Sequence, residues 1–245
     1  MISSTNNEKI KELSKLKIKK YRDESNKFLV EGKHLVEEAY KSNLLLEVFT
    51  IEDRILFNVE TTIITPDVMK KLSSTDTIPS IVGVVKKKEN TEIIGEKILL
   101  LDSIQDPGNL GTIIRSAAAF DIETIVLSND TVDLYNPKVI RATQGMIFKM
   151  NIVIGDIKTA MHMIRDKNIT IYGTDVVSGI LPNTLSTDEK SRFALVVGNE
   201  GNGISPEVYS LCDKMLFIKM NNNVESLNVG VATSIILYEM GVRNE

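Results

Sequence analysis

The chain has 245 residues, 42% of them hydrophobic, with a formal net charge of −4 and a pI near 5.4. That length fits one large domain or two small ones with an ample core, and the acidic balance gives no bulk-charge argument for a nucleic-acid partner. A single cysteine, Cys212, excludes an internal disulfide and a cysteine-rich metal site and fits a reducing cytoplasm. The polar stretch Ser3–Glu12 predicts no signal peptide, and no apolar run approaches the length of a membrane span.

The first 90 residues are expected to form a small αβ domain. Helical spacing over Lys33–Tyr40 and a proline at the start of Pro66–Leu72 predict two helices. Apolar runs predict strands at Leu44–Ile51, Thr61–Thr65 and Ile81–Val85. Near the start lies a cluster of seven basic residues, a weak indication of a polyanionic partner: Lys9, Lys11, Lys15, Lys17, Lys19, Lys20 and Arg22.

The charged run Lys86–Glu92 has no hydrophobic periodicity and is interpreted as the linker to a second domain, residues 97–245. In that domain apolar strands alternate with helices, which is typical of a mainly parallel sheet covered by helices on both faces. We expect the strands at Ile98–Leu101, Thr124–Leu127, Asn151–Ile154, Thr170–Gly173, Phe193–Val197 and Met215–Ile218. We expect the helices at Asn109–Phe120, Pro137–Gly145, Ile157–Lys167, Pro206–Cys212 and Ser226–Val242.

The segment from Asp106 to Arg115 connects a buried strand to a helix. Asp-Pro-Gly favours a turn, and Asn109 is a good residue to cap the helix that follows. Arg115 then falls within the first two turns of that helix, where a cation is electrostatically disfavoured. We therefore expect Arg115 to have a partner such as a phosphate, a carboxylate or a developing alkoxide.

Two further loops follow predicted strands, and in open α/β sheets ligands gather beyond the carboxyl ends of strands. The loop from Gly198 to Pro206 holds three glycines, which let the backbone approach a ligand, and Ser205 is predicted to cap the next helix. The loop before the last helix contains Ser226 and Asn228, which either cap that helix or serve a site. A Rossmann-type site is not expected, because no G-x-G pattern follows the first strand of the domain.

Three segments resemble the signature motifs of SpoU/TrmH-type RNA 2′-O-ribose methyltransferases, in the SPOUT superfamily. They are DPGNLGTIIRSA at 106–117, GNEGNG at 198–203 and ESLNV at 225–229, and they occur in the family's order. The resemblance covers about residues 98–243, and residues 138–145 are similar to a family segment near the substrate entrance. Residues 28–39 resemble the substrate-binding domain that often precedes the catalytic domain.

This resemblance implies a catalytic domain with a deep trefoil knot, a homodimer, S-adenosylmethionine as methyl donor, RNA as partner and no metal. The polar active-site positions of the family match Asn109, Arg115, Glu200, Ser226 and Asn228. The positions whose backbones hold the adenosine part of the cofactor match Gly198, Ile218 and Leu227. Two residues depart from the pattern: Lys219 replaces a frequent proline, which leaves the loop conformation open, and Gly230 replaces a frequent serine.

Arg115 is the best candidate for activating the ribose hydroxyl. Because removal of the proton from an arginine side chain is costly, we favour electrostatic stabilisation of the developing alkoxide. The family is often described with this arginine as the base. Asn109 and Glu200 are expected to hold Arg115 and the ribose, while Ser226 and Asn228 shape the loop around the methionine end of the cofactor.

The expected function is S-adenosylmethionine-dependent 2′-O-methylation of RNA in the cytoplasm, with 23S ribosomal RNA as the preferred substrate. Transfer RNA is the alternative substrate, disfavoured because tRNA enzymes of this type often lack the N-terminal domain. A resistance-type ribosomal RNA methyltransferase, a catalytically silent RNA-binding protein of the same fold and a nucleotide-binding α/β protein are further alternatives. Because all of the polar active-site positions are present, a catalytically silent protein is disfavoured. Because the three motifs occur in the family's order, an unrelated nucleotide-binding α/β protein is disfavoured as well.

Overall fold

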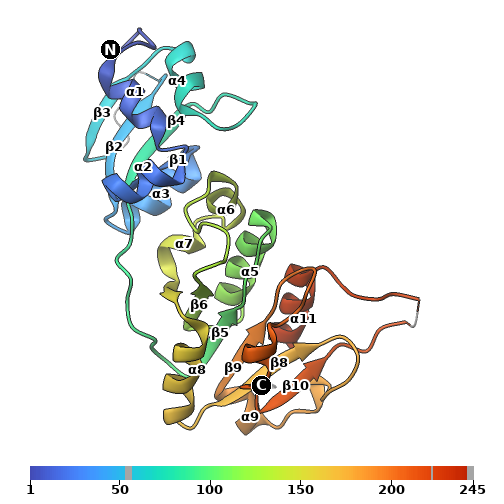
Figure 1. Ribbon diagram of the computed structural model, residues 1–245. Coiled ribbons are helices and arrows are strands. Elements are labelled where there is room, and N and C mark those ends of the chain that lie inside the picture. The colour runs from blue at the N-terminus through green and yellow to red at the C-terminus, as the bar shows by residue number, and fades with distance from the viewer. Residues whose placement is uncertain (53–56, 222, 242–245) are drawn as a thin grey trace. The chain divides into compact units, whose positions relative to one another are not determined.

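The computed structural model describes residues 1–52, 57–221 and 223–241, and it divides into two compact units (Figure 1). Unit 1 consists of Met1–Glu89 together with Asp133–Lys149, and unit 2 of Asn90–Val132 together with Met150–Glu245. The chain therefore enters unit 2, returns to unit 1 for one short segment, and then completes unit 2. The predicted domain ranges of 1–90 and 97–245 stay a prediction.

Unit 1 is a small mixed α/β domain, as predicted. Its four-stranded sheet has the order β1-β4-β2-β3, in which β2 and β3 are parallel and the other neighbours antiparallel. The strands are β1 (Lys27–Glu31), β2 (Leu45–Thr50), β3 (Glu60–Ile63) and β4 (Ile81–Lys86). The helices are α1 (Glu8–Lys15), α2 (Lys19–Ser25), α3 (Lys33–Lys41), α4 (Pro66–Leu72), α6 (Pro137–Ala142) and α7 (Met146–Lys149).

The N-terminal basic cluster is largely occupied by contacts within unit 1. Arg22 is only 3% exposed and pairs with Asp133. Lys9 pairs with Glu47 at 2.6 Å and with Glu60 at 3.2 Å. These cations neutralise carboxylates of their own domain, so the cluster as a whole is a weaker indication of a polyanionic partner than its sequence suggested.

The segment Asp133–Lys149 is held in unit 1 by packing and by charge. The rings of Tyr135 and Phe28 lie 4.7 Å apart. Lys149 Nζ contacts the carboxylate of Glu38 at 2.7 Å, and Lys41 contacts the same carboxylate at 2.8 Å. These hydrogen bonds lower the pKa of Glu38 to about 2.

Unit 2 is built on a six-stranded, all-parallel sheet with the order β10-β8-β9-β5-β6-β7, which confirms the predicted α/β architecture. The strands are β5 (Lys97–Leu101), β6 (Thr124–Ser128), β7 (Asn151–Gly155), β8 (Thr170–Asp175), β9 (Phe193–Val197) and β10 (Lys214–Phe217). The helices are α5 (Pro107–Ala119), α8 (Ile157–Asp166), η1 (Pro182–Thr184), α9 (Thr187–Ser191), α10 (Pro206–Tyr209) and α11 (Val229–Gly241). The predicted knot stays a prediction.

Both faces of this sheet are covered. Ile98 and Leu100 of β5 pack in one core cluster with residues of α8 such as Met161. Leu99 and Leu101 alternate with them on the same strand, so they point to the opposite face, and they are equally buried. This pattern explains why parallel strands with two covered faces have nearly continuous apolar sequences.

Several predictions at element ends were wrong, and the helix predicted over Pro137–Gly145 ends at Ala142. The helix after Pro206 ends at Tyr209 rather than Cys212, and the last helix begins at Val229 rather than Ser226; its predicted end, Val242, lies outside the described residues. The predicted linker is also shorter than expected, because Lys86 still belongs to β4 and Lys87 is buried against Asp23. Within the described ranges, no helix is long and apolar enough to cross a membrane.

Candidate functional site

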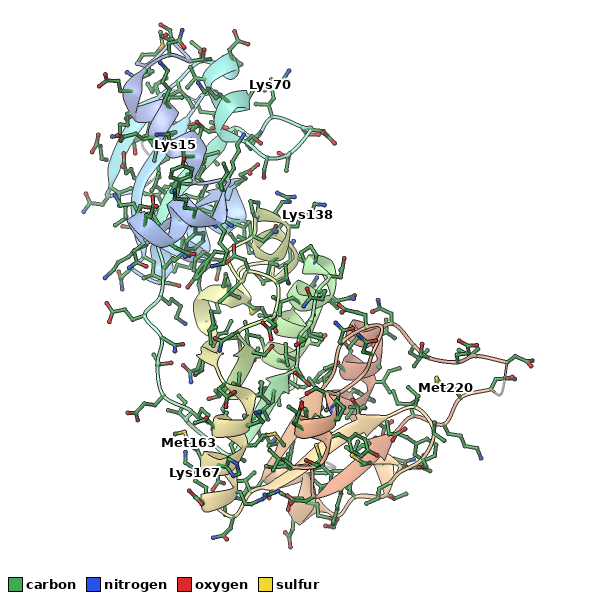
Figure 2. All side chains as sticks on the ribbon, in the orientation of Figure 1. Lys15, Lys70, Lys138, Met163, Lys167 and Met220 are labelled. Carbon is green, nitrogen blue, oxygen red and sulfur yellow. The ribbon has the colours of Figure 1, made fainter. Side chains whose placement is uncertain are left out.

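A cavity of about 340 Å³ lies at the carboxyl ends of β8, β9 and β10 in unit 2. Its wall comes from three stretches of chain: 174–176, 197–203 and the segment from Ile218 into α11. Met220, labelled in Figure 2, lies on the last of these stretches. The position agrees with the rule that ligands of open α/β sheets bind beyond the carboxyl ends of strands, and the volume suits a ligand of cofactor size.

The glycine-rich loop forms one wall of this cavity and is tightly folded. Asn199 and Gly203 exchange backbone hydrogen bonds of 2.8 and 2.9 Å. The Asn199 side chain donates to the Ser103 carbonyl at 2.8 Å and accepts from the Gly201 N–H at 2.9 Å. A Cβ atom on Gly198 would lie 2.1 Å from the Gly203 carbonyl carbon, so only glycine fits there. The loop is therefore a fixed backbone wall rather than an ordinary turn.

A chain of side-chain hydrogen bonds joins all three motif loops. Asn109 Nδ2 donates to Glu200 Oε1 at 3.1 Å. Asn109 Oδ1 accepts from Asn228 Nδ2 at 2.9 Å. Asn228 Oδ1 in turn accepts the N–H groups of Gly230 at 3.0 Å and Val231 at 3.2 Å, which caps α11. Three segments that are far apart in the sequence are thereby held in one arrangement.

Glu200 is the anionic member of this network. Its carboxylate accepts the backbone N–H of Gln105 at 3.1 Å and of Asp106 at 3.0 Å, in addition to the Asn109 amide. Burial alone would raise the pKa of Glu200, but these hydrogen bonds together lower it below its ordinary value. Glu200 is therefore ionised at neutral pH and fixes the start of α5 against the glycine-rich loop.

The sequence argument about the start of α5 was wrong in two respects. The N-cap is Asp106, whose Oδ1 accepts the Asn109 N–H at 2.8 Å, and Pro107 occupies the first turn. Arg115 is thus the ninth residue of α5 and lies in its third turn, too far from the helix N-terminus for the dipole to act on it. Asp-Pro-Gly was interpreted as a turn, but its proline is the first residue of the helix.

The Arg115 side chain is exposed, and no hydrogen bond or ion pair joins its guanidinium to another residue that the structure describes. Ser226 is also exposed and has no hydrogen-bond partner among the described side chains and backbone, so its predicted capping of α11 was wrong. Asn228 caps the helix instead. Arg115 and Ser226 consequently present polar groups that are available to a substrate or ligand.

The structure brings most of the predicted site residues to one place. Five of them line the cavity: Gly198, Glu200, Ile218, Ser226 and Leu227. Asn109 and Asn228 join this set through Glu200. Sequence reasoning missed Thr174, Asp175 and Val176, although a polar pair at the carboxyl end of the predicted strand at 170–173 was a usable signal. Within the described part of the chain, no group of three or more His, Cys, Asp or Glu residues could hold a metal ion.

Comparison with known proteins gives the same two parts. The model of the SpoU rRNA Methylase family matches residues 96–238, and that of the MRM3-like substrate binding domain matches residues 7–83. The chain is 36% identical over 245 residues to 23S rRNA (guanosine(2553)-2'-O)-methyltransferase RlmP of Bacillus subtilis, with 98% of each chain covered.

Two solved structures illustrate the structural similarity. The SpoU methyltransferase AviRb from Streptomyces viridochromogenes, in complex with the cofactor AdoMet, has a TM-score of 0.85 at 25% identity, with 96% of this chain and 97% of that chain covered. A putative RNA methyltransferase of the TrmH family from Porphyromonas gingivalis has a TM-score of 0.84 at 30% identity, with 98% of both chains covered.

Proposed function

Because this chain belongs to the SpoU rRNA methylase family, we propose that it transfers a methyl group from S-adenosylmethionine to a ribose 2′-hydroxyl of 23S ribosomal RNA. The observation that carries this proposal is the hydrogen-bond chain from Glu200 through Asn109 to Asn228, which holds the three motif loops together beside a cavity of cofactor size. A cytoplasmic location is part of the same proposal, because ribosomal RNA is the substrate.

The volume and the lining residues of the cavity suit S-adenosylmethionine. Its wall combines backbone that approaches closely, at Gly198, with apolar side chains of Ile218 and Leu227 that suit an adenine ring. These are the residues that we propose hold the adenosine. When bound, the cofactor supplies a sulfonium methyl group that is already electrophilic, so the protein's tasks are to orient the ribose and to stabilise its oxygen as it loses the proton.

Arg115 is proposed to stabilise the developing alkoxide. Its guanidinium is free of partners among the residues described, and its planar fork of N–H donors suits an oxygen that gains negative charge. A phosphate oxygen of the RNA would accept the hydroxyl proton as the oxygen–methyl bond forms and the sulfur–methyl bond breaks. Ser226 would contact the methionine end of the cofactor, and Asn109 with Glu200 would hold the loop that faces the ribose.

Unit 1 is proposed to supply RNA affinity and the choice of site. The support is its match to a substrate-binding domain over residues 7–83. Because Lys9, Lys20 and Arg22 are paired internally, the exposed cations Lys11 and Lys15 are better candidates for phosphate contacts than the whole basic cluster.

A second copy of the chain is proposed to cover α11. Val231, Ile235 and Tyr238 lie on one stripe of this helix at spacings of four and three residues, and they are 47%, 37% and 54% exposed. An apolar stripe of this kind on an otherwise buried helix is typical of a subunit interface.

Ribose-methylation mapping of total RNA tests the proposed function directly. RNA is compared from cells with the gene, without it, and without it but complemented by the Arg115→Ala variant. We expect one 23S ribosomal position to lose its methyl group without the gene and to stay unmethylated with the variant. Loss confined to a transfer RNA would replace the proposed substrate, and an unchanged methylation map would indicate a silent protein.

A further inference from the structure

The cavity wall contains one carboxylate that the proposed mechanism does not use. Glu200 is occupied by three donors, as described above, and the Asn199 side-chain oxygen accepts the N–H groups of Gly201 and Asn202. Asp175 also lines the cavity. Its Oδ1 accepts only the Val177 N–H at 2.8 Å, and its Oδ2 only the Tyr209 hydroxyl at 3.1 Å. An ionised carboxylate has about four acceptor positions, so about two remain open on Asp175.

The fold fixes where Asp175 lies along the cavity. It is the last residue of β8, and β8 lies between β9 and β10 in the sheet. Asp175 is paired in register with Phe217, the residue before Ile218, and Gly198 follows the end of β9 on the other side. Asp175 is therefore flanked by Ile218 and Gly198, two of the backbone positions proposed to hold the adenosine. In the sequence it lies outside all three family motifs.

The backbone around Asp175 is held from both directions. On the amino-terminal side it is part of β8. On the other side the chain returns at Ile180, which pairs with Leu216 and exchanges backbone hydrogen bonds of 2.8 and 3.1 Å with β10. A Cβ atom on Gly179 would lie 2.6 Å from the Met215 carbonyl oxygen, so the returning chain lies directly against β10. The carboxylate is consequently preorganised rather than carried on a free loop.

We propose that Asp175 is the ribose anchor of the cofactor pocket, accepting hydrogen bonds from the 2′,3′-diol of the bound adenosine. The proposal deepens the proposed function and rests on its placement of the adenosine. A carboxylate at the end of a parallel strand is a well-suited partner for a ribose diol, because both hydroxyls donate and both carboxylate oxygens accept. The Tyr209 hydroxyl orients the carboxylate from outside the cavity and so acts as a positioning group.

Two other partners for Asp175 give different binding results. The exocyclic amine of adenine would also donate to a carboxylate, but removal of a ribose hydroxyl would not change that contact. The sulfonium charge would be attracted to Asp175, but S-adenosylhomocysteine lacks that charge and keeps the diol. Ligands that differ by one hydroxyl or by one charge therefore separate the three possibilities.

Isothermal titration of the full-length protein tests the proposal with S-adenosylhomocysteine and its 2′-deoxy and 3′-deoxy analogues. We expect Asp175→Asn to bind S-adenosylhomocysteine about tenfold more weakly than wild type, because a hydrogen bond to a charged group is lost. For at least one deoxy analogue we expect the affinities of Asp175→Asn and wild type to differ by less than about threefold. The analogue lacks one ribose hydroxyl, so even the wild-type protein cannot form that hydrogen bond with it. S-adenosylmethionine should weaken by the same factor as S-adenosylhomocysteine.

Asp121→Asn is the matched control. It removes one carboxylate from the same unit, and its positive φ of 58° suits asparagine. Asp121 precedes β6 and so lies at the amino-terminal ends of the strands, whereas the cavity lies at their carboxyl ends. The affinity of Asp121→Asn for every ligand should equal that of wild type. Asparagine keeps the volume of aspartate and an oxygen that can accept the Val177 N–H, so we expect Asp175→Asn to fold. Retained binding of a deoxy analogue would show that it has done so.

Three results would overturn the assignment of Asp175. They are unchanged binding of S-adenosylhomocysteine by Asp175→Asn, equal weakening of all three neutral ligands, and weakening confined to S-adenosylmethionine. A failure of the proposed function would give a different result: the wild-type protein itself would bind neither S-adenosylmethionine nor S-adenosylhomocysteine.

Discussion

Gly198→Ala is expected to weaken cofactor binding because it displaces the backbone of the glycine-rich loop, although it removes no group that contacts the cofactor. The added Cβ would lie 2.1 Å from the Gly203 carbonyl carbon and 2.2 Å from the Ile204 nitrogen, whereas ordinary contact begins at about 3.4 Å. The loop would therefore have to retreat by about 1.3 Å, the difference between 3.4 and 2.1 Å. Neither neighbour is a flexible side chain, so rotation of a side chain cannot relieve the overlap.

Overpacking of this kind typically costs about 1–3 kcal/mol. Because the glycine-rich loop is a wall of the cavity, we expect Gly198→Ala to weaken S-adenosylmethionine at least tenfold, which corresponds to about 1.4 kcal/mol. Isothermal titration gives the affinity, and thermal melting reports the accompanying loss of stability.

Gly201→Ala is the internal control for this experiment. It lies in the same loop, but its Cβ would meet only the Asn199 Oδ1, at an ordinary distance of 3.5 Å. We expect its affinity for S-adenosylmethionine to stay within about threefold of wild type. Wild-type affinity in Gly198→Ala, or equal losses in both variants, would refute the steric argument.

Three further predictions concern activity, assembly and pH. Arg115→Ala should lower methyl transfer to RNA by at least about a hundredfold while changing cofactor affinity less than threefold, and Arg115→Lys should not restore it, because an ammonium group cannot reproduce the planar fork; near-normal methyl incorporation by either variant would contradict the assignment. Light scattering should report a dimer for the full-length protein and a monomer for Ile235→Glu, and a monomeric wild type would exclude the proposed interface. Because Lys149 and Lys41 hold the pKa of Glu38 near 2, below its ordinary value, the contribution of Glu38 to stability should be complete above about pH 5 and lost as the pH falls toward 2. The difference in urea midpoint between wild type and Glu38→Gln should therefore shrink over that range, and a constant difference would show that the ion pairs contribute nothing.

The buried strands could be predicted from sequence because their apolar runs are continuous. Leu99 and Leu100 face opposite sides of the sheet and are both fully buried, which a parallel sheet with two covered faces requires. Helices α1 and α2 could not be predicted with the same ease, because their sequences are mostly charged. Helix α1 is stabilised by a few contacts with distant parts of unit 1, made by Ile10 and Leu13.

The site was predictable as a set of loops but not in its internal geometry. Glycines after the predicted strand at 193–197 indicated a loop that approaches a ligand, and Gly198 and Glu200 of that loop line the cavity. Their individual roles came from the family resemblance and stay a prediction. Which residue caps a helix depends on backbone geometry: Asp106 takes the place that the sequence assigned to Asn109, and of the two caps offered for the last helix only Asn228 acts as one. The role proposed for Asp175 could not be inferred from sequence, because it depends on the position of β8 between β9 and β10 in the sheet.

The excursion of the chain through Asp133–Lys149 has a consequence for synthesis and for engineering. Unit 1 lacks Tyr135, Phe148 and the partner of Arg22 until Lys149 has left the ribosome, and by then β5, β6 and α5 of unit 2 have been made. The two units therefore cannot mature strictly one after the other during translation. For the same reason a module swap must exchange two pieces of sequence, and a single cut near residue 90 would leave apolar surface exposed on both products.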